Sequence, residues 1–284
     1  MKYTTPVRKS LEIRNSSGET ISADLRSPDS DPLPAVIVIV HSFMAFKDWG
    51  FFPFVGEEFA RRGYCTLTFN FSRNGVISNG DRITDGGKFS HNTFSHELSD
   101  LQAVINSIGD GALLPDLIQS PKIVLLGHSR GGGISIITAS RDPRVNALVT
   151  WSSIATFDRW TEHQKLLWRR ERYLRLSGNS DVSPLRLDIE VLKDYEENFE
   201  ALNILNAAQR VTIPWLIVHG KMDVTVPVRE GEALFNSSNS RAKEFIALDA
   251  VGHLYNAARK TEDNYSTLES IIKITHTWLK TSLV

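Results

Sequence analysis

Ser129 lies in the segment Gly-His-Ser-Arg-Gly at residues 127–131, a spacing that can support nucleophilic chemistry. The apolar run Ile123–Leu126 precedes this segment and a helix-like stretch follows it, so the serine stands between a strand and a helix. Such a turn is sharp, and glycines two residues to either side remove side chains that would clash. The pattern predicts Ser129 as an acyl-transfer nucleophile and the Arg130 N–H as a donor to the oxyanion. A Gly-rich turn with an incidental serine is the alternative.

His253 and Asp223 are the base and acid that a serine nucleophile requires. A serine hydroxyl reacts poorly at neutral pH unless a base adjoins it and an acid orients that base. His253 follows the apolar run Phe245–Leu248, and Asp223 follows the run Trp215–Val218. Loops at the carboxyl ends of parallel strands share one edge of the sheet, where chemistry is usually found. Taken singly, Asp223 could cap a helix and His253 could be structural; together they predict a catalytic triad.

The remaining histidines and the single cysteine are given structural interpretations. His128 is expected to pack near the serine turn, and His219 to hold the loop of the acid. His91 and His96 have a poor spacing for two metal ligands on one helix face, and the sequence holds no cysteine cluster. We therefore predict no catalytic metal and no cofactor. Cys65 lies in an apolar run and predicts a core residue.

The composition is ordinary for a globular protein, with 284 residues of which 41% are hydrophobic and 23% are charged. A net charge of −1 gives no reason to expect a nucleic-acid partner or an anionic membrane. The longest aliphatic run, Ala35–Val40, is far shorter than the roughly 20 residues that span a bilayer. With one cysteine and no signal-like start, we expect a cytoplasmic protein without stable membrane insertion. Monomer and homodimer are both left open.

The hydrophobic pattern predicts an α/β protein with a mostly parallel, doubly wound sheet. Two β-like runs around a turn, Val7–Arg14 and Thr20–Arg26, predict an N-terminal antiparallel hairpin. Continuous β-branched runs then predict strands buried on both faces. These runs are Ala35–Val40, Thr66–Phe69, Ile123–Leu126, Asn146–Trp151 and Trp215–Val218. Helix-like stretches alternate with them, as a doubly wound sheet requires. They are Pro53–Arg62, Thr93–Ile108, Gly131–Ser140, Val228–Phe235 and Tyr265–Leu279.

Two stretches interrupt this alternation. Ser72–His91 is rich in Gly, Asn and Asp and predicts a long loop. Residues 154–210 predict an all-helical cap over a core formed by residues 1–153 and 211–284. The expected cap helices are Phe157–Leu176, Ile189–Glu200 and Ala201–Gln209.

At the end of the run Ala35–Val40 the chain continues as His-Ser-Phe at residues 41–43. With the segments 127–133, 219–227 and 252–253, it resembles the α/β-hydrolase superfamily, in particular the dienelactone-hydrolase-like and cinnamoyl-esterase-like serine hydrolases. The resemblance covers nearly the whole chain and is weakest in the cap. It implies an α/β-hydrolase fold, a triad in the chain order Ser, Asp, His, and an oxyanion hole formed by the N–H groups of Phe43 and Arg130.

Ser42 departs from that resemblance, because family members usually have glycine at this place. Either its β-carbon alters the turn that aims the Phe43 amide, or its hydroxyl adds a polar group beside the oxyanion and the substrate pocket. Trp160, Leu167 and Trp168 suggest an apolar pocket under the cap, and core packing explains them equally well.

These features predict a serine hydrolase that cleaves carboxylic esters of small to medium acyl or aromatic substrates through an acyl-enzyme. Arg73 and Arg130 could recognise a substrate carboxylate, although we favour surface roles for both. The same triad suits a peptidase, a thioesterase or an acyltransferase. A non-catalytic ligand-binding protein is the alternative of another class, and Ser42 is the feature that favours it.

Overall fold

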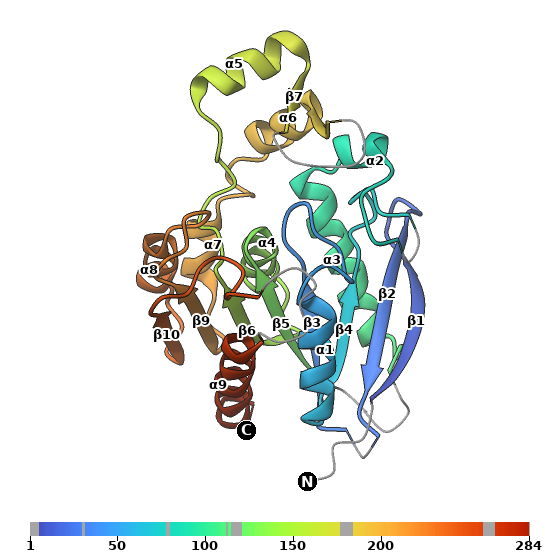
Figure 1. The fold of residues 1–284 in the computed structure, drawn as a ribbon, viewed down its shortest axis with the longest axis vertical. Helices are drawn as coiled ribbons and strands as arrows, with labels where there is room; N and C mark the ends of the chain where they lie inside the picture. The colour runs from blue at the N-terminus through green and yellow to red at the C-terminus, as the bar shows by residue number, and fades with distance from the viewer. Residues whose placement is uncertain are drawn as a thin grey trace.

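An eight-stranded sheet with the strand order β1-β2-β4-β3-β5-β6-β9-β10 forms the centre of the molecule (Figure 1). The computed structural model describes residues 6–29, 32–77, 80–111, 113–114, 121–176, 184–257 and 265–283. The strands are β1 (Val7–Arg14), β2 (Thr20–Ser27), β3 (Ala35–Val40), β4 (Cys65–Phe69), β5 (Lys122–His128), β6 (Val145–Trp151), β9 (Trp215–Gly220) and β10 (Lys243–Leu248). β1 and β2 form the predicted antiparallel hairpin, and the sheet is parallel from β4 to β10.

Helices cover both faces of this sheet, which confirms the predicted doubly wound architecture. Every residue of β3 is buried, and its side chains alternate between two separate hydrophobic clusters. Ile37 and Ile39 pack with α1 and α9, while Val36 and Val38 pack with the helices of the other face. The helices are α1 (Phe52–Arg61), α3 (Phe94–Gly109), α4 (Arg130–Ala139), α7 (Ile204–Arg210), α8 (Val228–Ser237) and α9 (Ser266–Ser282).

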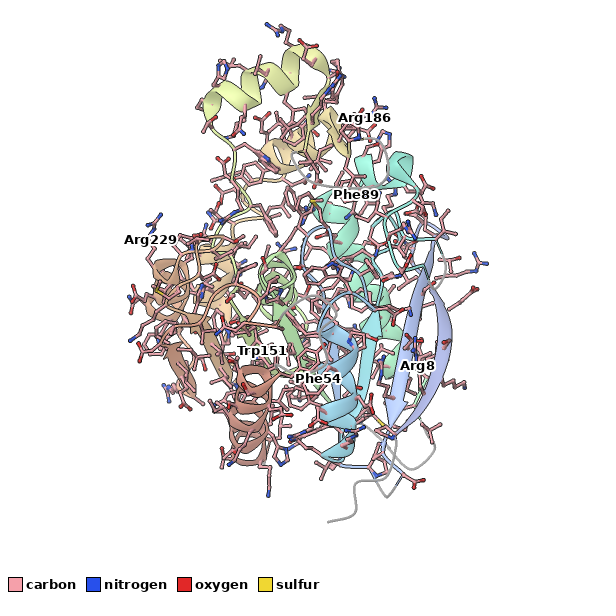
Figure 2. All side chains as sticks on the ribbon, viewed as in Figure 1. Arg8, Phe54, Phe89, Trp151, Arg186 and Arg229 are labelled. Atoms are coloured by element: carbon pink, nitrogen blue, oxygen red, sulfur yellow. The ribbon has the colours of Figure 1, made fainter. Side chains whose placement is uncertain are left out.

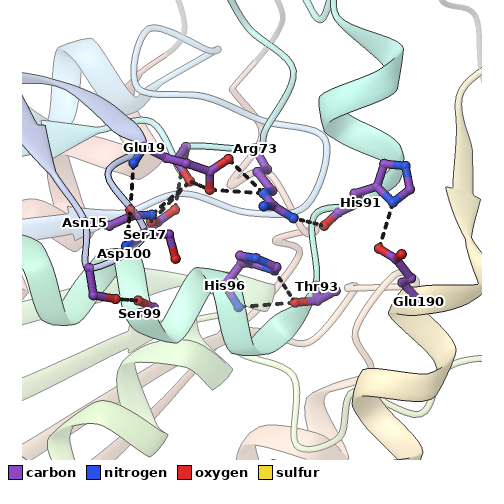
Figure 3. A network of polar contacts seen from close by, with 12 residues as sticks. Asn15, Ser17, Glu19, Arg73, His91, Thr93, His96, Ser99, Asp100 and Glu190 are labelled. Atoms are coloured by element: carbon purple, nitrogen blue, oxygen red, sulfur yellow. Dashed lines mark hydrogen bonds and ion pairs between the residues drawn. The ribbon is translucent and has the colours of Figure 1, made fainter.

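The turn of the N-terminal hairpin is tied to α3 by a polar network (Figure 3). Asn15 donates to the buried carboxylate of Asp100 at 2.7 Å. Arg73 donates to both carboxylate oxygens of Glu19 at 3.0 Å. Arg73 therefore forms a structural ion pair between the hairpin and the segment after β4, and this is the surface role that we favoured for it.

The segment between β6 and α7 is not all-helical, and that prediction was wrong. It contains α5 (Glu162–Glu171), β7 (Tyr173–Arg175), β8 (Arg186–Asp188) and α6 (Ile189–Glu197), and β7 pairs with β8 in a small antiparallel sheet. Trp160, Leu167 and Leu174 lie seven residues apart, a helical spacing that led to the prediction of one helix over Phe157–Leu176. Arg172 adopts a left-handed conformation with φ 68° and ends α5, so Leu174 lies in a strand.

Two further boundaries differ from the predictions. The predicted loop Ser72–His91 contains a short helix, α2 (Gly86–Ser90), which the side chain of Asp85 caps. α7 begins at Ile204, whose side chain lies against Gly133 of α4, so this helix packs on the core rather than with α5 and α6 (Figure 1). The division of the chain into core and cap at residues 154 and 210 stays a prediction.

In the part of the chain that the structure describes, none of the helices combines the length and apolar character that crossing a bilayer demands.

Candidate active site

Ser129 occupies a strained turn between β5 and α4. Its backbone angles are φ 54° and ψ −118°, which few non-glycine residues adopt. A β-carbon on Gly127 would overlap the carbonyl of Gly131, and one on Gly131 would overlap the carbonyl of Val40. The two glycines therefore allow α4 to approach the ends of β3 and β5 and to hold the serine at this edge of the sheet.

The structure brings Ser129, His253 and Asp223 together in one line of hydrogen bonds. His253 Nε2 lies 3.1 Å from Ser129 Oγ, and His253 Nδ1 lies 2.7 Å from Asp223 Oδ2. Because an ionised carboxylate only accepts, Nδ1–H donates to Asp223 and leaves Nε2 free to accept from the serine hydroxyl. This is the tautomer that a general base requires.

Asp223 is held as a carboxylate. Its Oδ1 accepts hydrogen bonds from the backbone N–H groups of Thr225 and Val226 at 2.9 and 2.8 Å. Burial raises the pKa of Asp223, but the hydrogen bonds from His253 and Val226 more than offset that effect and leave the pKa below its ordinary value. An ionised acid can therefore stabilise a protonated His253.

His219 holds the loop that carries the acid, as predicted, and His128, in the serine turn, also holds the loop that carries the base. His128 Nε2 donates to the carbonyl oxygen of His253 at 3.0 Å, and His219 Nε2 donates to that of Val226 at 2.8 Å. Complete burial, with the nearby His253, lowers the pKa of His128 to about 3. His128 is thus neutral, which fits its second ring nitrogen, Nδ1, being buried with no hydrogen-bond partner among the described residues.

Ser152 and Tyr255 adjoin the acid and were missed from the sequence. The Tyr255 hydroxyl donates to Ser152 Oγ at 3.0 Å, and a hydrogen bond from Ser152 helps to lower the pKa of Asp223. Both residues have positive φ, and Ser152 directly follows β6. A serine at the carboxyl end of the strand between those of Ser129 and Asp223 was the available signal.

Phe43 and Ser42 lie in the turn that leaves β3. His41 is fully buried and neutral, because burial lowers its pKa to about 4, and its Nδ1–H donates to the Ser42 carbonyl at 2.9 Å. Met44, not Ser42, takes the left-handed conformation of this turn, with φ 58°. A side chain at position 42 therefore causes no backbone strain of its own. Neither the Phe43 nor the Arg130 N–H donates to another group among the described residues.

Arg130 does not have the predicted surface role. Its side chain is buried, and its Nε donates to the carboxylate of Glu97 on α3 at 3.0 Å. Its guanidinium carbon lies 4.8 Å from the ring centre of Phe43 and 4.4 Å from that of Phe94. This pairing leaves no free cation at Arg130 to recognise a substrate carboxylate.

The insertion residues Trp160, Leu167 and Trp168 are at least partly buried. Trp168 is fully buried, with its ring 4.9 Å from that of Trp160, so packing within the insertion accounts for it. Trp160 also approaches Phe94 at 6.4 Å, whereas Leu167 is half-buried on α5. A role for Trp160, Leu167 or Ser42 in a substrate pocket stays a prediction.

One group of side chains in the described part of the chain could bind a metal ion. The ligand atoms of His91, Asp188 and Glu190 lie within 4.8 Å of one another. His91 Nδ1 is already bonded to Glu190 at 2.8 Å (Figure 3), and Asp188 caps α6. These residues are partly or fully exposed and none belongs to the predicted triad, so the cluster gives no support for a catalytic metal. The predicted absence of a metal stays a prediction.

Comparison with known proteins identifies the family. Residues 37–262 match the model of the "Alpha/beta hydrolase family", so the chain belongs to this family. No curated protein matches the chain in sequence. Among solved structures, the chain is similar to the esterase domain of a Rhodothermus marinus protein, with 20% identity, a TM-score of 0.66, and 98% of this chain and 100% of that chain covered.

Two further solved structures have the same fold. Est1E from Butyrivibrio proteoclasticus is 17% identical, with a TM-score of 0.68 over 96% of this chain and 98% of that one. DcsB, in complex with its substrate analogue, is 18% identical, with a TM-score of 0.75 over 97% of this chain and 99% of that one. At these identities the likeness establishes the fold.

Proposed function

We propose that this chain is a serine hydrolase that cleaves carboxylic esters, with Ser129 as nucleophile, His253 as general base and Asp223 as the orienting acid. The observation that carries the proposal is the line of hydrogen bonds from Ser129 Oγ through His253 to Asp223, at 3.1 and 2.7 Å. The strained backbone of Ser129 supports it, because such strain is typical of functional sites.

The reaction proceeds by acyl transfer in two stages. His253 Nε2 takes the proton from Ser129 as Oγ attacks the acyl carbon, and Asp223 stabilises the resulting imidazolium. The N–H groups of Phe43 and Arg130 donate to the oxyanion of the tetrahedral intermediate. His253 then gives its proton to the leaving alcohol. Water, deprotonated by His253, attacks the acyl-enzyme in the same way and regenerates Ser129.

We place the substrate among esters of small to medium acyl or aromatic acids. Est1E, one of the structural neighbours, has been described with ferulic acid bound, which supports including aromatic acids. A peptidase, thioesterase or acyltransferase would use the same triad and differ in the leaving group or acceptor. A non-catalytic binding protein is less well supported, because the left-handed residue of the turn after β3 is Met44 and Ser42 itself is not strained. A cytoplasmic location stays a prediction.

The test is turnover of p-nitrophenyl esters of increasing chain length, and of methyl ferulate, by the wild type and two serine variants. Ser129→Ala is expected to lower kcat by about 10⁴-fold or more with an unchanged Tm. Ser135→Ala is the matched control, because Ser135 is a buried serine of α4, the helix that begins after Ser129, and its hydroxyl donates to the Gly131 carbonyl. Full activity in Ser129→Ala would show that another residue is the nucleophile. Labelling of the wild type by a fluorophosphonate separates a catalyst from a binding protein.

A further inference from the structure

The Arg130 side chain is buried although the residue lies at the catalytic edge of the sheet. It is 6% exposed, and Glu97, which accepts its Nε–H at 3.0 Å, is 2% exposed. A second nitrogen of the guanidinium donates to the Asn92 carbonyl at 3.5 Å. A buried ion pair of this kind rarely adds stability over apolar packing, so a role in fixing geometry is a better explanation for it.

The guanidinium also contacts the other residue that provides an oxyanion-hole N–H. It lies over the Phe43 ring, 4.8 Å from the ring centre, and on Phe94 at 4.4 Å. The Phe43 ring packs in addition on Phe89 at 5.7 Å. Figure 2 shows Phe89 in the region between the sheet and the insertion. One side chain therefore connects the turn after β3 with the start of α4.

These ring contacts are one part of what holds Phe43 in place. No hydrogen bond in the described part of the chain involves its backbone N–H or carbonyl, and the next residue, Met44, is left-handed. An oxyanion hole needs its donors held to within about 0.5 Å. Hydrogen bonds from His41 Nδ1 and the Ala45 N–H to the Ser42 carbonyl orient the planar peptide that carries the Phe43 N–H. The Arg130 guanidinium and the Phe89 ring hold the Phe43 side chain and so add to the alignment of that N–H.

We propose that the Arg130 side chain, held by Glu97 and stacked on Phe43, is a positioning group that aligns the two N–H donors of the oxyanion hole. The inference rests on the proposed function, since it presumes that those N–H groups act on a tetrahedral intermediate. Arg130 would then act in two ways. Its backbone N–H donates to the oxyanion, and its guanidinium sets the position of Phe43.

Glu97→Gln is the sharpest variant, because it keeps the shape and one acceptor oxygen but removes the charge. Burial raises the pKa of Glu97 to about 7, against the opposing effect of Arg130 and Asn92, and Asp100 on the same helix adds to the rise. The amide thus imitates the protonated carboxyl. Arg130→Met removes the charge from the other partner while retaining its apolar stem.

Asp100→Asn is the matched control. Asp100 is a buried carboxyl one turn along α3, and its hydrogen-bond partners, Asn15 and Ser72, lie outside the oxyanion hole. Each variant is first labelled to completion with a fluorophosphonate to count competent Ser129 sites. A separate, unlabelled sample of each variant then gives KM, the affinity for an alkyl boronic acid, which imitates the tetrahedral intermediate, and kcat, which is expressed per site that labels.

We expect Glu97→Gln and Arg130→Met to label fully and to lose about 10- to 100-fold in kcat per labelled site, with KM changed by less than about threefold. Boronate affinity should fall in parallel, and Arg130→Lys should restore part of the loss. Asp100→Asn should lower Tm yet keep kcat per labelled site within about twofold of the wild type.

The inference would be overturned if Glu97→Gln and Arg130→Met kept the wild-type kcat per labelled site, or if Asp100→Asn lost as much kcat as they do. Either result would leave the proposed function standing. A wild type that neither labels nor turns over would overturn both. If the charge variants do not fold, Phe43→Leu decides the question, because it retains the ion pair and the N–H but removes the ring. Its kcat should fall about tenfold with KM unchanged, and an unaffected kcat would reject the inference.

Discussion

The two sides of Ser129 are held in place by different kinds of contact. On the base side, which comprises Asp223, His253 and their loops, much of the support comes from the backbone. Asp223 accepts two backbone N–H bonds, and a β-carbon on Gly220 would overlap the carbonyl of Val251, so the two loops touch directly. On the oxyanion side, the peptide before Phe43 accepts hydrogen bonds from His41 and the Ala45 N–H, whereas the Phe43 ring is held by the side chains of Phe89 and Arg130.

The fold itself provides the backbone contacts of the base side, whereas the ring contacts of Phe43 depend on particular side chains. A backbone hydrogen bond persists through most substitutions, because every residue except proline supplies the same N–H. A buried ion pair is lost when either partner is replaced. We therefore expect the base side to tolerate changes around the triad and the oxyanion side to be sensitive to them.

Asp223→Asn should have the largest effect on the base side. The amide of asparagine can donate to His253 Nδ1 and so favour the wrong tautomer, in which Nε2 no longer accepts from Ser129. We expect kcat to fall by about 10³- to 10⁴-fold with little change in Tm. Asp249→Asn, at an exposed aspartate paired with Lys221, is the control and should behave as the wild type. A loss below about tenfold would mean that His253 does not depend on Asp223.

His128→Gln tests the side-chain contact that fixes the histidine loop. Because burial and the nearby His253 lower the pKa of His128 to about 3, the unfolded chain takes up a proton near its ordinary value of 6.5 while the folded protein does not. The free energy of unfolding therefore falls as the pH drops below 6.5. One proton per pH unit is worth about 1.4 kcal/mol, so this residue costs about 2 kcal/mol of stability between pH 6.5 and 5.

Urea unfolding of wild type and His128→Gln across that interval measures the difference. The variant should lose about 2 kcal/mol less than the wild type on acidification, because glutamine does not titrate. His41, whose pKa burial lowers to about 4, is present in both proteins and contributes to both slopes. Equal losses in the two proteins would show that His128 is protonated in the folded state, despite its burial and the buried Nδ1 that has no partner among the described residues.

The base side was the more predictable of the two from the sequence. Ser129, Asp223 and His253 each follow an apolar run, and parallel strands bring such loops to one edge whatever the intervening residues. The fold was predictable for the same reason, because β-branched runs and helical periods are local signals.

The Arg130–Glu97 pair was harder to predict, because its partners are distant in sequence and no local pattern joins them. A signal did exist in the predicted helix Thr93–Ile108. Glu97 lies on its apolar stripe with Leu101 and Ile105, where an unpaired charge would be costly. The prediction of an all-helical insertion was wrong for a different reason. The seven-residue spacing of its apolar residues continues past Arg172, but this single left-handed residue ends the helix.

Ser152→Ala should have the smallest effect, and it tests the comparison most directly. The substitution removes one hydrogen bond to Asp223 and the partner of the Tyr255 hydroxyl, which retains the Val218 carbonyl at 3.4 Å. Asp223 keeps His253 and its two backbone donors, so we expect kcat to fall by only about three- to tenfold.

Ser153→Ala is the control for this change, because Ser153 is equally buried and donates to the carbonyl of Ile154. It should match the wild type in kcat. If Ser152→Ala instead cost a hundredfold or more, the base side would depend on single side chains as much as the oxyanion side does. The contrast between the two sides of Ser129 would then lie in the kind of contact alone and not in its consequences for catalysis.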